Sequence, residues 1–431
     1  MADLVAPVTV AEIELAQPAT VTHMSVAAPG EGGRACQALV LVRLHAVPVG
    51  TIVVDAPAGT VDASSCAEAA WALLGTSIRS RLTSEGSDGS DGSDGLPADP
   101  PAADAPLISV VVATRERPRS LAACLDSLSR MDYPNYEIVV VDNDPVTTAT
   151  ASLVGNRGEE NLRYAREPRR GLAAAHNRGL EQAAGAIVAF TDDDVKLDGK
   201  WLTEISKGFR TAPDVACVTG LIMPAELQTQ AQVLLETHGH FGKGFDKRLV
   251  NCGAHRPADP LFPFTVGKLG SGANMAFRAD RLRELGGFDP ATGTGTMARG
   301  GDDLAAFFSV LAAGCSLVYQ PTALAWHQHR RDLASLRNQT YGYGVGLGAY
   351  LTSALADHPA MVGQAVRLAP PGLRYAFHPA SPRNARAGSS WPRELVWRER
   401  RGLAFGPLAY GVSRLRSRGA RRPDGSWQLS Q

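Results

Sequence analysis

Residues 107–145 read LISVVVATRERPRSLAACLDSLSRMDYPNYEIVVVDNDP, and this stretch decides the fold. Residues 107–113 form a continuous apolar run, as expected of a strand that is buried on both faces of a parallel sheet. Residues 119–130 carry apolar side chains at helical spacing, and residues 136–141 are a second apolar run. The order strand, helix, strand predicts an α/β unit with a right-handed crossover.

The same alternation continues along the chain. Residues 172–184 are expected to form a helix and residues 186–190 a third buried strand. Together these units predict an α/β fold with a doubly wound, mostly parallel, Rossmann-like sheet, whose ligands bind beyond the carboxyl ends of the strands. Polar residues stand at those three ends: Thr114, Asp142 and the run Asp192-Asp193-Asp194.

A composition change separates this unit from the chain before it. Residues 83–106, TSEGSDGSDGSDGLPADPPAADAP, contain almost nothing to bury, which predicts a flexible linker. Residues 1–82 have strand-like runs at 38–44 and 47–54 and helical spacing at 66–82, which predicts a small α+β accessory module. We therefore expect the chain after the linker to fold and bind its ligand without this module.

The sheet domain is expected to span residues 107–335, and residues 336–431 to form a helical, Arg-rich extension. From residue 367 onward the sequence contains 13 arginines, no lysine and 3 acidic residues. Such a tail could contact anionic phosphates or a membrane surface, although a solvated basic end is the commoner explanation.

The whole chain is balanced in charge, with 43 basic and 43 acidic residues among 431, which argues against a nucleic-acid partner. The first residues lack the basic start and apolar run of a signal peptide, and no stretch reaches the roughly 18 apolar residues of a membrane span. The six cysteines include no CxxC pair, which fits reduced thiols. These features predict a cytoplasmic protein, either soluble or peripheral at the inner face of the membrane.

The run Asp192-Asp193-Asp194 places three carboxylates side by side, where they repel one another unless a positive charge lies among them. Hard oxygen ligands of this kind suit Mg²⁺ or Mn²⁺. An acidic surface turn would explain the run equally well on its own. Asp142, directly after another buried strand, can accept hydrogen bonds from a base or ribose and shifts the balance toward a nucleotide site.

Six motifs in order resemble the inverting glycosyltransferase family 2 with the GT-A fold, over about residues 107–331. They are ISVVVATRERPRSLAACLDSL, EIVVVDNDP, PRRGLAAAHNRGL, FTDDDV, GANMAFRADRLRELGGFD and GGDDLAAFFSVLAAGCSLVYQPTALAWHQHR. The resemblance implies metal-dependent, hexosyltransferase-like transfer with inversion, from a UDP-, GDP- or dTDP-linked sugar to a hydroxyl acceptor, glycan or lipid-linked. It also implies Mn²⁺ or Mg²⁺ as cofactor, and a polysaccharide, glycolipid or secondary-metabolite pathway.

The resemblance also assigns residues to roles. The residues expected to bind the nucleotide-sugar donor are Thr114, Arg115, Glu116, Asp142, Arg170, His176, Asp192 and Asp193. The metal ligands are Asp194, Asp192 and His327, with His329 a weaker candidate and a structural role the alternative for His327. The acceptor and its sugar fall to Gly272, Ala273 and Asn274.

The general base is expected at Asp303, with Asp302 as the alternative. Most relatives have Glu-Asp at these two positions and many have a further Asp two residues later. Here Asp302 shortens the first side chain by one methylene, and Ala305 removes the later charge, which puts acceptor handling in doubt. One base and one face of attack imply inversion.

Two other classes of function remain open. A nucleotidyltransferase would open on a Gly-rich basic phosphate loop, whereas residues 113–117 are ATRER without glycine. A nucleotide-sugar-binding or scaffold protein with weakened catalysis is the other alternative, and the altered segment 301–305 is its only support.

Overall fold

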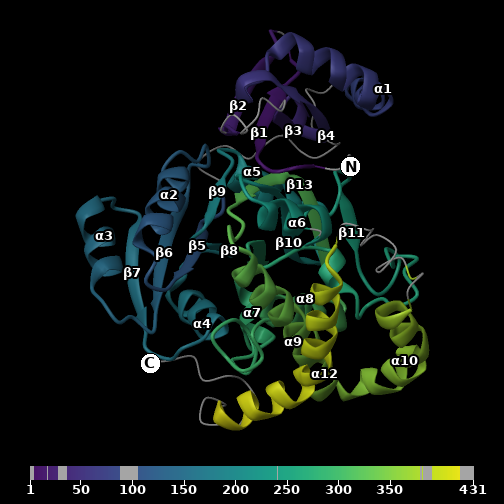
Figure 1. The fold of residues 1–431 in the computed structure, drawn as a ribbon. Coiled ribbons are helices and arrows are strands. Elements are labelled where there is room, and N and C mark those ends of the chain that lie inside the picture. The colour runs from purple at the N-terminus through teal and green to yellow at the C-terminus, as the bar shows by residue number, and fades with distance from the viewer. Residues whose placement is uncertain are drawn as a thin grey trace.

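The computed structural model describes residues 4–16, 18–27, 36–87, 105–239, 241–378, 381 and 391–417 (Figure 1). Most of the expected linker, residues 88–104, lies outside the described residues, as do the last arginines of the tail. All six cysteines lie in the described residues, and none of them forms a disulfide bond. Two separate sheets form, one of nine strands and one of four.

The nine-stranded sheet has the order β11-β13-β10-β12-β8-β5-β6-β7, with β9 paired to β13. Its strands are β5 (Ile108–Thr114), β6 (Tyr136–Asn143), β7 (Leu162–Glu167), β8 (Ile187–Asp192), β9 (Val195–Leu197), β10 (Val215–Pro224), β11 (Arg248–Val250), β12 (Asn274–Arg278) and β13 (Ser316–His327). All but β9, β11 and β12 run in one direction, because β12 is antiparallel to both β8 and β10. The predicted doubly wound, mostly parallel sheet is confirmed.

Helices cover both faces of this sheet. The helices are α2 (Pro118–Leu128), α3 (Ala149–Arg157) and α5 (Trp201–Phe209) on one face, and α4 (Leu172–Gln182), α7 (Ala279–Glu284), α8 (Asp302–Ala312) and α9 (Leu333–Asp357) on the other. Neighbouring residues of β5 divide between the two cores, Val110 on the α2 side and Val111 on the α4 side. This explains why the strand reads as an unbroken apolar run.

The bounds of two elements, β6 and α8, matter for the site. Strand β6 continues through Asp142 to Asn143, so Asp142 lies within the strand rather than after it. Helix α8 begins at Asp302, so both candidate bases lie in its first turn. Gly301 precedes them with a φ of 87°, a left-handed conformation that suits glycine.

The C-terminal extension is helical, as expected, and consists of α9, α10 (Val362–Phe377) and α12 (Arg393–Arg416). Helices α9 and α12 lie side by side in Figure 1. They approach so closely that a Cβ atom on Gly344 would collide with the carbonyl oxygen of Glu399. None of the helices among the described residues has the length and apolar content to cross a membrane.

The N-terminal residues form the second sheet, with the order β2-β1-β3-β4. Its elements are β1 (Val8–Glu14), β2 (Thr20–Ser25), β3 (Cys36–Leu44), β4 (Val47–Ala56) and helix α1 (Ala63–Ser87). Strands β3 and β4 and helix α1 were expected from the sequence, although α1 continues past residue 82 into the expected linker. Strands β1 and β2 were missed.

The N-terminal sheet shares a hydrophobic core with the large domain. Leu39 and Leu41 of β3 lie in one buried cluster with Met223 and Trp326 of the large sheet. The backbone N–H of Val8 also donates to the carbonyl of Leu227 over 2.9 Å. This continuous core argues against the expectation that the chain after the linker folds on its own.

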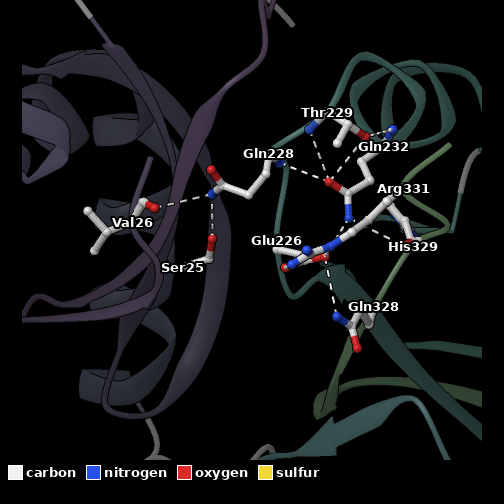
Figure 2. Close-up of polar contacts among 9 residues, drawn as sticks. All are labelled: Ser25, Val26, Glu226, Gln228, Thr229, Gln232, Gln328, His329 and Arg331. Carbon is white, nitrogen blue, oxygen red and sulfur yellow. Dashed lines mark hydrogen bonds and ion pairs between the residues drawn. The ribbon is translucent and has the colours of Figure 1, made fainter. Parts of the chain in front are cut away.

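Polar contacts reinforce the same junction. Figure 2 shows Gln228 reaching across to the end of β2, where its amide donates to Ser25 Oγ over 2.7 Å. Arg43 of β3 donates to Asp198 over 2.7 Å and to Glu12 over 3.1 Å, and its side chain is 10% exposed. The buried guanidinium thus connects both sheets.

We expect Arg43→Ala to destabilise the folded chain by about 3 kcal/mol or more, because it leaves Asp198 without its buried counter-charge. Denaturant unfolding at pH 7 measures the loss. Arg281→Ala, which removes an exposed i,i+3 pair with Glu284, is the control and should change stability little. Equal stability of the two variants would show that the junction does not depend on this ion pair.

Candidate active site

The end of β8 and the end of β13 bring an acidic turn and a histidine together. Strand β9 turns back after Asp194 and pairs with β13, so that Val195 lies opposite His327. His327 Nε2 is 3.5 Å from Asp194 Oδ1. One ligand atom from each of Asp192, Asp194 and His327 lies within 4.8 Å of the others, so these three side chains could hold a metal ion.

Arg117 supplies the positive charge among these carboxylates. Its guanidinium donates to Asp193 Oδ1 over 2.5 Å and to Asp194 Oδ2 over 2.8 Å. The Thr114 hydroxyl donates to the other oxygen of Asp193 over 2.7 Å. Asp194 therefore divides its oxygens, since Oδ2 binds Arg117 and Oδ1 faces His327.

The three carboxyl groups differ in their pKa values. Burial raises the pKa of Asp192 well above its usual value, and the charges of Asp194 and Asp193 raise it further. Burial raises the pKa of Asp193 to about 6, although Arg117 opposes the shift. For Asp194 the effect of burial is outweighed by His327 and Arg117, which hold its pKa below the usual value. Burial and mutual repulsion therefore oppose three negative charges in this cluster, and a bound cation would reduce the repulsion among the carboxylates.

A second histidine fixes how His327 presents its ring. His327 Nδ1 lies 2.9 Å from His329 Nδ1, and His329 Nε2 lies 3.0 Å from Glu236 Oε2. An ionised carboxylate only accepts, so His329 Nε2 donates and, in the neutral ring, His329 Nδ1 accepts from His327 Nδ1. This arrangement leaves His327 Nε2 unprotonated toward Asp194, which is the form that binds a metal.

The surroundings keep this pair of histidines buried and in place. Phe241 stacks on the His327 ring with centroids 5.3 Å apart. Burial lowers the pKa of His327 to about 4, so its ring is neutral at pH 7. Figure 2 shows Gln232 of α6 (Gln230–Gly239) donating to the backbone carbonyl of His329 over 3.2 Å.

The expected nucleotide side is built at the ends of β5 and β6. Asp142 is 1% exposed and accepts from the Tyr164 hydroxyl over 3.0 Å, while its Oδ1 atom has no hydrogen-bond partner. Burial raises the pKa of Asp142. Glu116 accepts from the backbone N–H groups of Val146 and Thr147 and so ties the two strand ends together.

The candidate bases lie at the start of α8, beside the loop before β12. Asp303 Oδ2 accepts from the backbone N–H of Gly272 over 2.8 Å, and its Oδ1 accepts from that of Leu304 over 2.8 Å. Burial and the neighbouring charge of Asp302 raise the pKa of Asp303 to about 6. Asp302 itself is 4% exposed and its Oδ2 lies 3.3 Å from His176 Nδ1.

One cavity of about 1310 Å³ joins these groups. The expected site residues that line it are Thr114, Arg115, Arg170, Asp192, Asp193, Asp194, Gly272, Ala273, Asp302, Asp303 and His327. Glu116, Asp142, His176 and Asn274 are not among its lining residues within the described part of the chain. The metal candidates and the candidate bases thus line one shared cavity.

The expectation that Asn274 contacts a sugar is wrong. Its side chain is fully buried, accepts from Trp201 Nε1 over 2.9 Å, and donates to the carbonyls of Leu221 and Ala323. These bonds use its amide to hold β12 against its neighbours. His176 is similarly enclosed, with its ring against Phe190 and Phe288, and reaches the site only through Asp302.

Five lysine and arginine residues in the cavity wall were not anticipated: Arg117, Lys243, Lys268, Arg299 and Arg330. Arg117 lies three residues after Thr114, at a strand end already marked as functional, so its position was a usable signal. Lys243 lies between two glycines, and burial lowers its pKa to about 8. No periodicity marks Lys243 or Arg330, because both lie outside regular elements.

Several known proteins are similar to this chain in sequence. Succinoglycan biosynthesis protein ExoM of Rhizobium meliloti (strain 1021) is 28% identical over 253 residues, which are 57% of this chain and 75% of that protein. The pre-mycofactocin glycosyltransferase of Mycobacterium tuberculosis (strain ATCC 25618 / H37Rv) is 28% identical over 228 residues, 52% of this chain and 43% of that protein. The glucosyl-dolichyl phosphate glucuronosyltransferase of Haloferax volcanii is 25% identical over 190 residues, 43% of this chain and 57% of that protein. The chain therefore spans less than two thirds of the latter two relatives.

Among solved structures, a mannosyltransferase from Pyrobaculum calidifontis in complex with GDP-Man and Mn²⁺ is similar with a TM-score of 0.43 and 17% identity, over 82% of this chain and 86% of that one. A family model described as "Glycosyltransferase like family 2" matches residues 105–341. This match covers more than half of the 431 residues and contains both the acidic turn and the start of α8. The chain belongs to glycosyltransferase family 2.

Proposed function

We propose that the chain is a metal-dependent inverting glycosyltransferase that moves a hexose from a nucleotide-sugar donor to a hydroxyl acceptor. The observation that carries this proposal is the single cavity that holds Asp192, Asp194 and His327 at one part of its wall and Asp302 and Asp303 at another. The first group can hold a cation for the donor phosphates, and the second group can take the proton of an acceptor hydroxyl.

The donor side of the proposal rests on charge and on one unused acceptor. Arg117, Arg170 and Arg330 line the cavity and can contact a diphosphate. Asp142 directly precedes the cavity-lining Asn143, and its Oδ1 atom, which has no hydrogen-bond partner among the described residues, can accept a hydrogen bond from a base or ribose that reaches it. UDP-, GDP- and dTDP-sugars all meet these demands, and a thermal-shift screen of the three with Mn²⁺ distinguishes them.

Asp192, Asp194 and His327 would hold the divalent cation. Two carboxylates and an unprotonated imidazole nitrogen fit Mn²⁺ better than Mg²⁺, which prefers oxygen ligands and retains its waters. The cation, when bound, supplies positive charge that neutralises the leaving diphosphate. Asp193 is held by Thr114 and Arg117 and positions the turn.

Asp303 is the proposed general base. It lines the cavity, and its carboxylate is fixed by two backbone N–H groups. With a pKa of about 6 it is ionised at pH 7, yet more basic than an ordinary Asp. It takes the acceptor hydroxyl's proton as that oxygen attacks the anomeric carbon, and Asp302 supports it from beside His176.

A binding protein with weakened catalysis is the competing proposal, since Ala305 replaces an acidic residue of many relatives. Helix α8 nevertheless keeps two carboxylates in the cavity wall. Donor hydrolysis with and without Mn²⁺ separates the two proposals, because only an enzyme turns the donor over.

We expect Glu236→Gln to weaken Mn²⁺ binding by about 10–100-fold, the usual cost of losing a partner of a metal-ligating histidine. A Gln amide can donate to His329 Nε2 and so no longer fixes the ring tautomers. Isothermal titration with Mn²⁺ measures the loss. Glu284→Gln, on an exposed part of α7, is the matched control, and equal affinity of both variants would remove the histidine pair from the metal site.

We expect Asp303→Asn to lower transfer by about 10²–10⁴-fold, while donor and Mn²⁺ still bind. The pH dependence follows from the raised pKa of Asp303. Below about pH 6 its carboxyl is protonated and cannot accept a proton, so kcat/KM of the wild type should rise through pH 6 and then level.

Asp303→Asn should lose this rise in kcat/KM. Asp302→Asn is the comparison and should cost less in rate. Transfer close to wild type by Asp303→Asn, with a collapse in Asp302→Asn alone, would assign the base to Asp302 instead.

A further inference from the structure

The cavity continues from the carboxylates into an apolar arm, which we define by Leu347, Leu351 and Leu355 of α9 and Leu368, Leu373 and Phe377 of α10. Leu304, directly after the proposed base, also lines the cavity, so the polar and apolar parts of its wall meet there. All six residues of the apolar arm lie beyond residue 341, where the family match ends. The apolar arm is therefore built by this chain's own C-terminal helices.

Helix α10 has an unusual environment for a helix so rich in apolar residues. None of its residues is buried, and the side chains of Leu373 and Val366 are 59% and 68% exposed. In Figure 1 α10 stands at the edge of the molecule, to one side of α9 and α12. Contiguous apolar surface that stays exposed beside a cavity is typical of a binding site.

The charge on these helices indicates what surface they face. The charged residues of α10 are Arg367 and Arg374, both exposed. Helix α12 adds exposed Arg393, Arg401 and Arg416 together with exposed Trp397, Leu408 and Leu415. Exposed arginines beside exposed Trp and Leu side chains on one pair of helices are typical of segments that lie on an anionic membrane surface.

We propose that the apolar arm binds the hydrocarbon chain of a lipid-linked acceptor, which is taken from an anionic membrane surface on which α10 and α12 rest. This proposal rests on the proposed function, which decides which part of the cavity holds the donor and which part holds the acceptor. A nucleoside diphosphate has no hydrocarbon chain, and its phosphates belong with the arginines and the metal-binding carboxylates, so it leaves the apolar arm to the acceptor. The acceptor hydroxyl then lies at Asp303, with its chain running past Leu304 toward α10.

The first test uses n-alkyl β-D-glucosides with chains of six, eight and ten carbons, below their micelle concentrations, titrated into the full chain. Each added CH₂ that enters the apolar arm should tighten binding roughly three- to four-fold. Binding should need neither Mn²⁺ nor nucleotide. Affinity that does not change with chain length would overturn the proposal.

A matched pair of variants locates the binding. Leu373→Gln changes an exposed residue that lines the apolar arm, and Leu408→Gln changes one on α12, 63% exposed, that does not line the cavity. Leu373→Gln should weaken binding of the ten-carbon glucoside about five- to ten-fold, and Leu408→Gln should leave it unchanged. Ala369→Trp, which fills the apolar arm from α10, should abolish it. Equal effects of the two Leu variants would overturn the assignment.

Nucleotide binding in the presence of Mn²⁺ separates this proposal from the proposed function. If nucleotides bind but glucoside affinity is independent of chain length, only the acceptor inference fails. If glucosides bind with the expected length dependence but no nucleotide binds, the donor site and the proposed function fail, and the apolar site stands.

The last test concerns the source of the ligand. The full chain should float with phosphatidylcholine vesicles that contain phosphatidylglycerol, and much less with phosphatidylcholine alone. Replacing Arg367 and Arg374 by Gln should weaken this binding about five-fold for each arginine, whereas Arg281→Gln on α7 should not. Glucoside binding without flotation on either vesicle would overturn the membrane source.

Discussion

The repulsion among Asp192, Asp193 and Asp194 is the constraint to which the rest of the site responds. Three adjacent carboxylates with little access to water must be compensated by positive charge or by protons. Arg117 compensates two of them, and its bond to Asp194 Oδ2 leaves Oδ1 turned toward His327. The pairing of β9 with β13 places the acidic turn beside His327. The cluster is thus incompletely neutralised by protein, which is what a cation site requires.

The orientation of His327 depends on residues well away from the acidic turn. Glu236 of α6 sets the donor and acceptor roles of His329, and His329 sets those of His327. Helix α6 is in turn preceded by Gln228, which bonds to Ser25 of the N-terminal sheet (Figure 2). The N-terminal residues therefore support the loop from which the histidine pair is positioned. This gives them a structural task in the site without any chemistry of their own.

The sequence predicted the sheet domain well because a strand buried on both faces reads as an unbroken apolar run, which β5 and β6 show clearly. Thr114 and Asp192 were recognised for the same reason, because each is a polar residue at the end of such a strand. Strands β1 and β2 were missed because both are short and neither reads as an apolar run: β1 contains Glu12 and Glu14, and no residue of β2 is buried. Asn274 was misassigned because a sequence shows that an amide is present but not that three buried partners already use it.

The apolar arm, which we propose binds the acceptor, differs from the proposed donor site in how it is held. The proposed donor residues belong mostly to the sheet and its strand ends, whereas the apolar arm belongs to α10 and to α9, and α9 meets the sheet domain at several buried points. One such point is Gly301, where a Cβ atom would collide with the carbonyl oxygen of Gly346, so that α9 lies directly against the start of α8. The proposed base at the start of α8 is therefore held against α9, whereas α10 has no buried residue. Under the proposals above, a chain built in this way can change which acceptor it admits by changing α10, with the proposed base and the proposed metal ligands left where they are.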